Sequence, residues 1–465
     1  MPLNSISPID GRYSRATLPL SPFFSEKGLM HYRVIVEGEY LIALSELKIK
    51  LKKLSDKEKK IIRSLYDLSL EDAQIISNIE TKGYKNIKAT DHDVKAVEYF
   101  IKEKLSKTSL KESIEWVHFA ITSEDTNNIA YALMLADSLD QILKPKIKEI
   151  IDNLNKLALK YKNLPMLART HGQAATPTTF GKEMRVYAAR LEKRMDALDN
   201  IKIQAKLNSA SGNWNAHVVA YPKIDWRKFT RNFIESFNKN RSQKLEANLI
   251  TTQIECHDSY IALFDILRQI NTILIDFNQD IWRYISDEWI IQKPVEGTIG
   301  SSTMPHKINP IKFENSEGNL GMANALFEFF ARKLPISRLQ RDLSDSTVER
   351  NFGVAFAHSF IAYEYLLKGL SRIEVNENKV REVLGDHTEV IAEAVQTILR
   401  REGVKMPYEK LKELTRGKHV TLQDIGRFID SLDVNIEVKK ELKRITPLNY
   451  IGLAPKIVSS VKLKK

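Results

Sequence analysis

The stretch IALFDILRQINTILIDFNQDIW, residues 261–282, carries apolar side chains at steps of three or four residues. The members of this set are Phe264, Leu267, Ile270, Leu274, Phe277 and Ile281. Such spacing places them on one face of a helix. Because residues 245–292 contain no glycine or proline, we expect one helix of roughly 70 Å, at 1.5 Å per residue. A single globule rarely covers so long a helix, so we expect an all-α bundle whose exposed stripes pack against copies of the same chain.

The segments on either side of this run continue the helical pattern. Residues 124–161 form a second long segment, which we expect to bend near Pro145 because proline removes a helical hydrogen bond. Residues 310–333 and 344–372 have the pattern of two more long helices, and the alternation typical of strands is scarce. These patterns predict an all-α fold with a central bundle of long helices.

Glycine and proline residues cluster between the helical segments and indicate where the chain divides. We expect three domains: shorter helices and loops in residues 1–110, the long-helix bundle in residues 111–372, and short helices in residues 373–465. A chain of 465 residues exceeds the usual size of one compact domain, which agrees with this division.

The composition excludes several classes of protein. Hydrophobic residues make up 43% of the chain and charged residues 28%, as in ordinary globular proteins. The single cysteine, Cys256, excludes an intramolecular disulfide, and neither a secretory signal nor a membrane-spanning run is expected, so we interpret the chain as cytoplasmic. The net charge of +12 is spread along amphipathic segments. A nucleic-acid partner is therefore not expected, although the charge leaves it as an alternative.

A loop of unusual composition, GTIGSSTMPHKINP at residues 297–310, separates two of the helical segments. It contains two glycines that give backbone freedom, three consecutive hydroxyl groups, a cation and an amide; these residues are Gly297, Gly300, Ser301, Ser302, Thr303, Lys307 and Asn309. Such a segment can fold over a ligand and bring a hydroxyl group and a cation to it together. A surface connector is the alternative interpretation.

Two clusters that contain histidine are candidates for acid–base chemistry. Thr170 and His171 lie in a stretch rich in glycine and proline, at residues 165–181. A histidine in a loop can serve as a general acid or base near neutral pH. The second cluster is DHD at residues 91–93, ahead of a predicted helix. The alternatives are a histidine that bonds to nearby backbone and an Asp91 that only caps the helix.

Two further clusters suit an anionic ligand. Thr122 and Ser123 precede a long helix, whose free N–H groups favour an anion. The stretch SRLQRDLSDSTVERN combines arginines that can bind phosphate or carboxylate with hydroxyl groups; its members are Arg338, Arg341, Ser344, Ser346 and Arg350. Helix capping and a salt-bridged surface are the alternatives. The sequence has no metal-ligand spacing and no glycine-rich nucleotide motif, so no metal or cofactor is expected.

The loop at residues 297–310 also carries a family resemblance. Its segment GSSTMPHKIN fits the pattern Gly-Ser-x-x-Met-x-x-Lys-x-Asn of the fumarase/aspartase superfamily at every fixed position. Further segments, among them SPIDGRY, HFAITSEDTNN, RTHGQAATPTT, TTQIE and QRDLSDSTVERN, resemble the adenylosuccinate lyase family. The resemblance runs from about residue 7 to about residue 455 and so covers nearly the whole chain.

The resemblance implies a C–N lyase of purine biosynthesis. Members of this family release fumarate from adenylosuccinate, giving AMP, and from SAICAR, giving AICAR. They are homotetramers with a core of about twenty long helices, and each active site draws residues from three subunits. The resemblance therefore implies succinylated nucleotides as substrates, other copies of the chain as partners, and no cofactor.

The resemblance also assigns roles to residues of this sequence. Ser301 matches the catalytic base, and His171 matches the general acid that protonates the departing nitrogen. The matched substrate contacts are Arg12, Tyr13, Asp91, His92, Asp93, Thr122, Ser123, Gln253, Ser302, Lys307, Asn309, Asn315, Arg341, Ser346 and Arg350, and the supporting residues are His118 and Thr170. Removing a proton beside a carboxylate builds up negative charge, which cations and N–H donors stabilise.

The match departs from the family before the His-Asp pair. The family form carries asparagine where this chain has Asp91, and residues 81–90 resemble an insertion. The aspartate adds a negative charge near an anionic substrate. Two alternatives stay open at this point: another lyase of the superfamily, such as argininosuccinate lyase, and a non-catalytic relative that kept the bundle.

Overall fold

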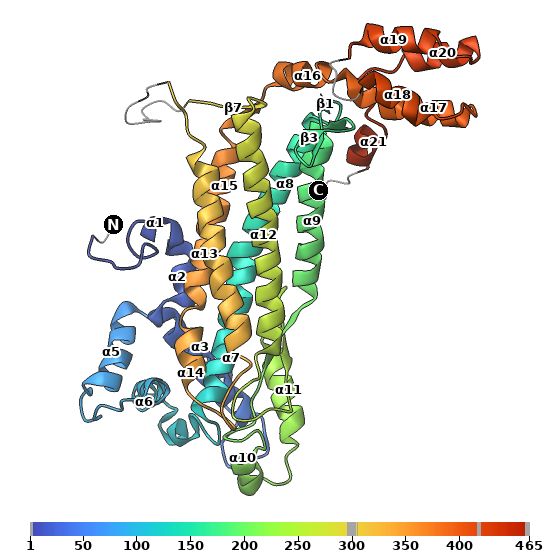
Figure 1. The fold of residues 1–465 in the computed structure, drawn as a ribbon. Helices are drawn as coiled ribbons and strands as arrows, with labels where there is room; N and C mark the ends of the chain where they lie inside the picture. Colours follow the sequence, from blue (N-terminus) through green and yellow to red (C-terminus); the bar gives the residue numbers. More distant parts are fainter. Residues whose placement is uncertain (1–2, 295–303, 305, 416–419, 461–465) are drawn as a thin grey trace. The chain divides into compact units, whose positions relative to one another are not determined.

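The computed structural model describes residues 3–294, 304, 306–415 and 420–460, and it is mainly helical (Figure 1). The chain forms two compact units, each built from segments that are distant in sequence. Unit 1 contains Met1–Ile147, Arg194–Thr272 and Gly318–Glu364, and unit 2 contains Lys148–Lys193, Ile273–Glu317 and Tyr365–Lys465. The all-α class is confirmed. The division into three successive domains stays a prediction.

The N-terminal part of unit 1 consists of short helices around the longer helix α3. Their bounds are α1 (Ser14–Thr17), η1 (Leu18–Leu20), α2 (Ser21–Phe24), α3 (Glu26–Ser45), α4 (Asp56–Ser64), α5 (Leu70–Thr81), α6 (Asp93–Leu105) and η2 (Lys111–Trp116). The side chains of Ser25, Ser55 and Ser69 cap α3, α4 and α5 by accepting hydrogen bonds from backbone N–H groups of the first turn. Helix α3 packs against α6 and α7.

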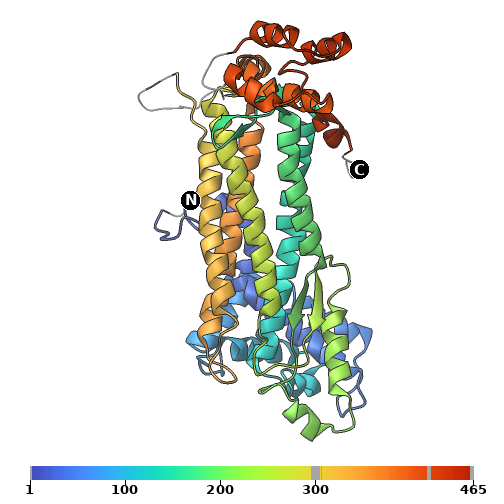
Figure 2. The ribbon, with the colours of Figure 1, turned by 45° about the vertical axis from the view of Figure 1, so that its right-hand side comes forward.

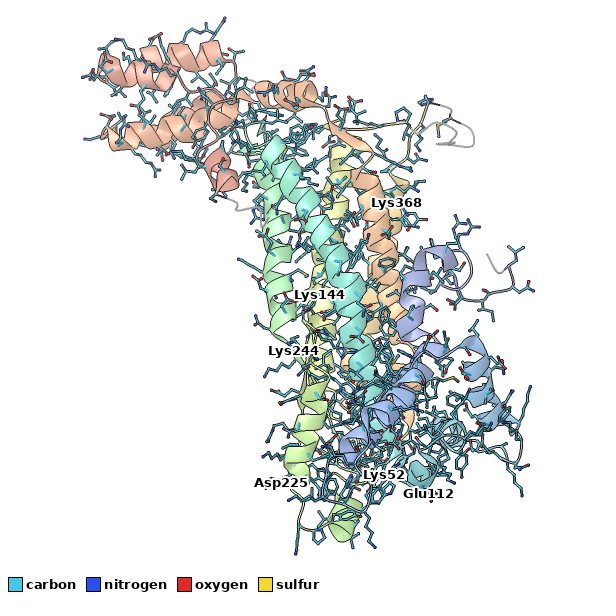
Figure 3. All side chains as sticks on the ribbon, turned by 180° about the vertical axis from the view of Figure 1, so that it is seen from behind. Lys52, Glu112, Lys144, Asp225, Lys244 and Lys368 are labelled. Atoms are coloured by element: carbon cyan, nitrogen blue, oxygen red, sulfur yellow. The ribbon has the colours of Figure 1, made fainter. Side chains whose placement is uncertain are left out.

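The second long helical segment is confirmed, and it has an internal interruption. It consists of α7 (Ser123–Ser138), a π-helical turn (Leu139–Leu143) and α8 (Lys144–Lys160). The π turn ends just before Pro145, where we expected a bend. Within the turn, Asp140 accepts a hydrogen bond from the backbone N–H of Ser242 (2.7 Å). Lys144, labelled in Figure 3, pairs with Asp140 at 3.2 Å. The interruption is therefore stabilised by contacts with a distant segment.

The helix expected over residues 245–292 is shorter than predicted. Helix α12 spans Asp258–Ser286, about 44 Å at 1.5 Å per residue. Lys244–Ala247 forms strand β6 instead, which pairs in parallel with β5 (Lys202–Ala205) (Figure 2). His257, immediately before α12, has a φ of 63°, and a left-handed residue interrupts a helix. Neither change is marked by glycine or proline, which is why the sequence pattern missed them.

The remaining helices of the bundle region complete its long elements. They are α9 (Phe180–Asn200), α10 (Asn215–Ala220), α11 (Trp226–Ser236), α13 (Ile311–Lys333), α14 (Ser344–Glu349) and α15 (Phe352–Leu370). The helix predicted at residues 310–333 is confirmed, and the helix predicted at residues 344–372 is divided in two after Glu349. Within the described ranges, no helix combines the length and apolar character that crossing a membrane requires.

The core of unit 1 is rich in aromatic side chains. The ring centroid of Phe264, on α12, lies 5.5 Å from that of Phe327 and 5.6 Å from that of Phe330, both on α13. It also lies 5.1 Å from the ring centroid of Phe352, on α15. All four side chains are almost completely buried. Because burying each such side chain contributes about 1.5–3 kcal/mol, these contacts hold the three helices together.

Unit 2 contains short antiparallel strand pairs and the C-terminal helices. Strands β1 (Pro165–Met166) and β4 (Thr178–Thr179) enclose the hairpin of β2 (Arg169–Thr170) and β3 (Gln173–Ala174), and β7 (Ile290–Gln292) pairs with β8 (Ile373–Val375). The C-terminal helices are α16 (Glu377–Gly385), η4 (Thr388–Ile391), α17 (Ala392–Arg401), α18 (Pro407–Thr415), α19 (Leu422–Asp430), α20 (Ile436–Lys443) and α21 (Ala454–Ser459). These short strands agree with the scarcity of strand patterns in the sequence.

A close approach of α8 and α9 supports the outer strand pair of unit 2. Gly181 lies in the first turn of α9, and a Cβ atom there would be 2.2 Å from the carbonyl oxygen of Ala158 and 2.6 Å from the backbone nitrogen of Lys162. The backbone N–H of Gly181 donates to the carbonyl oxygen of Tyr161 (3.1 Å). Any other residue at this position would force the backbone of the two helices apart.

Candidate active site

Helix α7 begins at two hydroxyl residues that are predicted to contact the substrate, Thr122 and Ser123. Thr122 is the N-cap, and its backbone N–H donates to Oδ2 of Asp125 (2.8 Å). Oδ1 of Asp125 accepts a hydrogen bond from the backbone N–H of Asn208 (2.9 Å) and pairs with Nζ of Lys206 (2.9 Å). The ion pair is fully buried, and a buried charge requires partners of this kind. These buried contacts of Asp125 therefore fix the start of α7, which includes Ser123.

The loop before α7 is strained and held by two hydroxyl groups. His118 and Ala120 have φ values of 61° and 62°, a conformation that costs a residue with a side chain about 1 kcal/mol or more. The hydroxyl group of Tyr40 donates to the carbonyl oxygen of Phe119 (2.9 Å). The hydroxyl group of Ser209 donates to the carbonyl oxygen of Ala120 (2.7 Å). These bonds fix the loop, and with it the position of the α7 N-terminus.

His118 is tied to helix α3. Its Nδ1 lies 2.6 Å from Oε1 of Glu37, which also accepts a hydrogen bond from Oγ1 of Thr126 (2.7 Å). Burial alone would lower the pKa of His118, but the Glu37 carboxylate outweighs burial and raises the pKa above its ordinary value. Through Glu37, these contacts connect His118 in the loop to Thr126 in α7. Its supporting role in the reaction stays a prediction.

The Asp93 cluster, which we define as Glu26, Arg33, Asp93 and Arg350, joins two predicted substrate contacts. Oδ2 of Asp93 lies 2.7 Å from Nη2 of Arg33 and 2.7 Å from Nη2 of Arg350. Nη1 of Arg350 pairs with Oε1 of Glu26 at 2.8 Å. Burial would raise the pKa of Asp93, but the arginines, Arg33 first, lower it below its ordinary value. The guanidinium group of Arg350 is partly exposed and can reach an anion.

His92 connects the Asp93 cluster to helix α7. It is the N-cap of α6, where its Nδ1 accepts a hydrogen bond from the backbone N–H of Lys95 (3.3 Å), and its Nε2 lies 3.2 Å from Oγ of Ser123. Asp91 is exposed and has a φ of 47°, and its backbone N–H donates to the carbonyl oxygen of Glu80 (2.9 Å). The alternative in which Asp91 caps the helix is therefore wrong, because His92 takes that position.

The Glu124 cluster, which we define as Glu124, Gln253, Arg341, Asp345 and Glu349, lies beside the first turn of α7. Nη2 of Arg341 lies 3.2 Å from Oε2 of Glu124, and Nη1 donates to Oε1 of Gln253 (3.2 Å). The three carboxylates are buried. Burial and the nearby Glu349 raise the pKa of Glu124 to about 8. Two further predicted substrate contacts, Gln253 and Arg341, are thus bonded to each other.

His171 occupies the turn between β2 and β3 in unit 2. Both turn residues, His171 and Gly172, are left-handed, with φ values of 53° and 74°. The side chain of His171 is exposed and has no hydrogen bond to a described residue, so the alternative of a bond to nearby backbone finds no support there. Two residues after β3, Oγ1 of Thr176 donates to Oε2 of Glu393 (2.7 Å). The same oxygen accepts a hydrogen bond from the hydroxyl group of Tyr450 (2.9 Å).

The other predicted residues that the structure describes lie within or next to helices, except Thr170, which lies in a strand. Arg12 and Tyr13 precede α1 in unit 1. Ser346 lies in α14, where its backbone N–H donates to Oδ1 of Asp345 (2.7 Å). In unit 2, the residues ahead of α13 and in its first turns are Lys307, Asn309 and Asn315. Thr170 ends β2, directly before His171.

The predicted base lies outside the described residues. Ser301, Ser302 and Thr303 belong to the part of the 297–310 loop that is not described, together with Gly297 and Gly300. Of this loop, the structure describes residues 304 and 306–310, where the backbone N–H of Lys307 donates to the carbonyl oxygen of Met304 (3.1 Å). The role of the serine loop therefore stays a prediction.

Sequence reasoning missed the residues that hold the predicted contacts in place. Arg33 and Glu37 belong to α3, and Glu124 and Glu349 neighbour selected residues; all four are buried. Their partners are distant in the sequence, so no local motif identifies them. The one available signal is a charge within an apolar run, as at Glu37 in RVIVEGEYLIAL, because a charge is rarely buried without a partner.

Comparisons with known proteins agree with the resemblance. A family model described as lyase matches residues 11–324, and one described as adenylosuccinate lyase C-terminal matches residues 337–451. The curated adenylosuccinate lyase of Escherichia coli (strain K12) is 46% identical over 99% of both chains. That of Dictyostelium discoideum is 49% identical over 97% of both chains.

Solved structures have the same fold. The 3-carboxy-cis,cis-muconate lactonizing enzyme from Pseudomonas putida has a TM-score of 0.70 at 19% identity, over 95% of both chains. A fumarate lyase from Mesorhizobium sp. BNC1 has a TM-score of 0.70 at 16% identity, over 95% of this chain and 96% of that chain. At such identities the likeness concerns the fold, whereas the curated relatives share nearly half of the residues. The chain therefore belongs to the adenylosuccinate lyase family and is a C–N lyase.

Proposed function

We propose that this lyase releases fumarate from adenylosuccinate, giving AMP, and from SAICAR, giving AICAR. The observation that carries the proposal is the 46% identity with the Escherichia coli adenylosuccinate lyase over 99% of both chains. The Asp93 and Glu124 clusters support it. Arg350 pairs with Asp93, the first residue of α6, and Arg341 pairs with Glu124 in the first turn of α7. Guanidinium groups and free helical N–H groups suit a substrate with phosphate and carboxylate groups.

In the proposed reaction, a base removes a proton from the succinyl carbon beside a carboxylate. The electron pair of that C–H bond forms the double bond of fumarate, and the C–N bond breaks as the nitrogen accepts a proton. We assign the base to Ser301 and the acid to His171. A serine acts as a base only if its alkoxide is stabilised, and Lys307 is the cation nearest to it in the loop sequence. The exposed position of His171 suits a group that meets its substrate in an assembled site.

The proposal includes a homotetramer in which three subunits contribute to each active site. Its support is an apolar face on the part of α13 that lies in unit 1. Met322 and Phe329 are 54% and 45% exposed, and their spacing of seven residues places them on one side of the helix. Gly318, on the same side, meets no described atom where a side chain would begin. Exposed apolar faces of this kind mark interaction sites, and copies of the chain are the proposed occupants.

The substrate assignment is tested with the purified protein in the reverse direction. Fumarate is offered with AMP, with AICAR or with arginine, and the succinylated product is separated by chromatography. We expect products from AMP and AICAR and none from arginine, because only the two nucleotides carry the phosphate that the arginines can bind. A product from arginine alone would overturn the assignment.

The base is tested with Ser301→Ala. We expect kcat to fall by about 10²–10⁴-fold, the usual effect of removing an acid–base group, while the affinity for adenylosuccinate stays close to that of the unaltered protein. Thr303→Ala is the matched control, because it removes a hydroxyl group from the same loop. Substantial turnover by a purified Ser301→Ala protein of unchanged oligomeric state would refute the role.

A further inference from the structure

The Glu124 cluster contains polar atoms that lack partners. Among the described residues, none forms a hydrogen bond to Oε1 of Glu124, to Nε of Arg341 or to Oδ2 of Asp345. The side chain of Glu124 is 1% exposed and that of Arg341 is 17% exposed. Each buried polar atom without a partner costs about 1–3 kcal/mol. Proteins keep few such atoms, and those that are kept call for an explanation.

The three carboxylates of the cluster outnumber its one cation, Arg341, and among the described residues only Glu349 has a further cationic partner: its Oε1 lies 3.2 Å from Nε2 of His257. Burial would lower the pKa of His257, but Glu349 raises it to about 9. The carboxylates that face Glu124 are those of Glu349 and Asp345, both on α14. The facing cations are Arg341 and Lys206, and Lys206 is already engaged in a buried ion pair. Burial and the carboxylate of Glu349 raise the pKa of Glu124 to about 8. A charge on Glu124 is therefore unfavourable for the folded protein.

Glu124 nevertheless connects two segments that carry predicted substrate contacts. It lies in the first turn of α7, close to the N-cap Thr122, and its Oε2 reaches Nη2 of Arg341 at 3.2 Å. Gln253 accepts a hydrogen bond from the other terminal nitrogen at 3.2 Å, and its own amide donates to the carbonyl oxygen of Ala210 (3.1 Å). Because both terminal nitrogens are engaged, the plane of the guanidinium group is fixed.

We propose that Glu124 is a positioning residue: it holds the guanidinium group of Arg341 in the orientation that binds the substrate, at a cost to the stability of the fold. The inference rests on the proposed function, since it requires that Arg341 contacts the substrate. A buried ion pair contributes little net stability when burial and a neighbouring carboxylate disfavour one of its charges, as they do here for Glu124. Functional sites, in contrast, commonly retain groups that destabilise the protein.

Glu124→Gln separates the two roles. The amide keeps the shape of the side chain and removes the charge that the neighbouring carboxylates disfavour. We expect the KM for adenylosuccinate to rise about tenfold, as for a weakened hydrogen bond to a charged group, because the glutamine amide offers one acceptor oxygen and an NH₂ group that cannot accept from Arg341, with kcat nearly unchanged. The thermal unfolding midpoint should stay the same or rise. A lower midpoint together with an unchanged KM would overturn the inference, because it is the result of a merely structural role.

Asp137→Asn is the matched control, because Asp137 lies in the same helix and pairs with Arg241 at 2.5 Å. We expect this change to lower the unfolding midpoint and to leave KM unchanged. A second test combines Glu124→Gln with Arg341→Lys. If Glu124 acts through Arg341, the double variant has the KM of Arg341→Lys alone. Additive effects on KM would overturn the inference.

The failure of the inference and that of the proposed function are distinguishable. Release of fumarate from adenylosuccinate by the unaltered protein tests the function by itself. If that release occurs and Arg341→Lys leaves KM unchanged, Arg341 does not bind the substrate, and the positioning role of Glu124 is overturned while the lyase activity stands.

Discussion

The start of α7 in unit 1 and the turn between β2 and β3 in unit 2 both carry predicted site residues, but they are held in different ways. Thr122 and its neighbours rest on buried partners such as Asp125 and Glu124. His171 is exposed, and the bond from Thr176, two residues after β3, to Glu393 is exposed as well. Buried partners fix a side chain in advance, whereas an exposed side chain depends on what covers it. The start of α7 is thus fixed within one chain, whereas in the proposed homotetramer assembly positions the turn that carries His171.

The largest effect that tests this comparison is expected from His171→Ala. Loss of the acid should lower kcat by about 10²–10⁴-fold, and it should leave the unfolding midpoint unchanged because the side chain is exposed. Steady-state kinetics and thermal unfolding measure the two quantities. His387→Ala, which removes another histidine of unit 2, is the control. Normal kcat for His171→Ala between about pH 6 and 9 would rule out the acid.

Asp93→Ala tests how much the ion pairs of the Asp93 cluster stabilise the folded protein. The change leaves the guanidinium groups of Arg33 and Arg350 without their shared carboxylate. We expect the free energy of unfolding to fall by about 2–4 kcal/mol, measured by urea denaturation. Arg63→Ala removes the pair with Glu39, in which the arginine side chain is 53% exposed against 3% for Arg33, and it should cost less than about 1 kcal/mol. Equal losses for the two variants would contradict the distinction between buried and exposed partners.

Tyr40→Phe tests the loop before α7. The change removes the hydroxyl group that donates to the carbonyl oxygen of Phe119 and that also lies 2.8 Å from Nε2 of the buried His217. Because Tyr40 is completely buried, we expect a loss of about 1–3 kcal/mol in the free energy of unfolding, together with a higher KM. Tyr221→Phe, which removes a hydroxyl group that accepts a hydrogen bond from the exposed backbone N–H of Lys50, is the control. An unchanged free energy of unfolding for Tyr40→Phe would show that the strained loop needs no such support.

His118→Asn should have a smaller effect that depends on pH. The pKa of His118 is raised above 6.5 in the folded protein. Its charged form therefore contributes stability that is fully present below about pH 6.5 and is lost as the pH rises through the raised pKa. We expect the substitution to cost more free energy of unfolding at pH 6 than at pH 9. Urea denaturation at both values measures this difference, and a reversed dependence would contradict the charge assignment.

The smallest effect is expected from Thr176→Val. It removes the exposed bond to Glu393 two residues after β3. We expect kcat to fall by about two- to fivefold, because an exposed hydrogen bond contributes at most about 1 kcal/mol. Tyr450→Phe removes the second bond to the same carboxylate and should have a similar or smaller effect. A loss as large as that of His171→Ala would mean that the single chain already fixes the acid.

The helices were predictable where their pattern is local. The apolar spacing at residues 261–282 predicts α12, because an amphipathic helix repeats every 3.6 residues. The start of α12 was not predictable. Strand β6 exists because it pairs with Lys202–Ala205. The left-handed residue before α12 is His257 and not a glycine, so the sequence does not indicate the interruption. Pairings between distant segments leave little trace in a local pattern.

The candidate site was predictable only in its motifs. Thr122, Asp93 and Arg341 stand in recognisable stretches, and their family resemblance selected them. Arg33 and Glu124 were not selected, because their significance arises from contacts with Asp93 and Arg341, which lie far away in the sequence. A motif identifies groups that could meet a substrate, whereas the groups behind them are defined by the folded chain.

The absence of a side chain at Gly181 has a consequence for natural variation in this enzyme. The two helices that meet there bracket residues 161–179, which include the turn that bears His171. A larger residue would displace the imidazole without altering any atom that touches a substrate. Inherited changes that impair such a lyase should therefore be sought at tight backbone contacts of this kind, even though these positions take no part in the reaction itself.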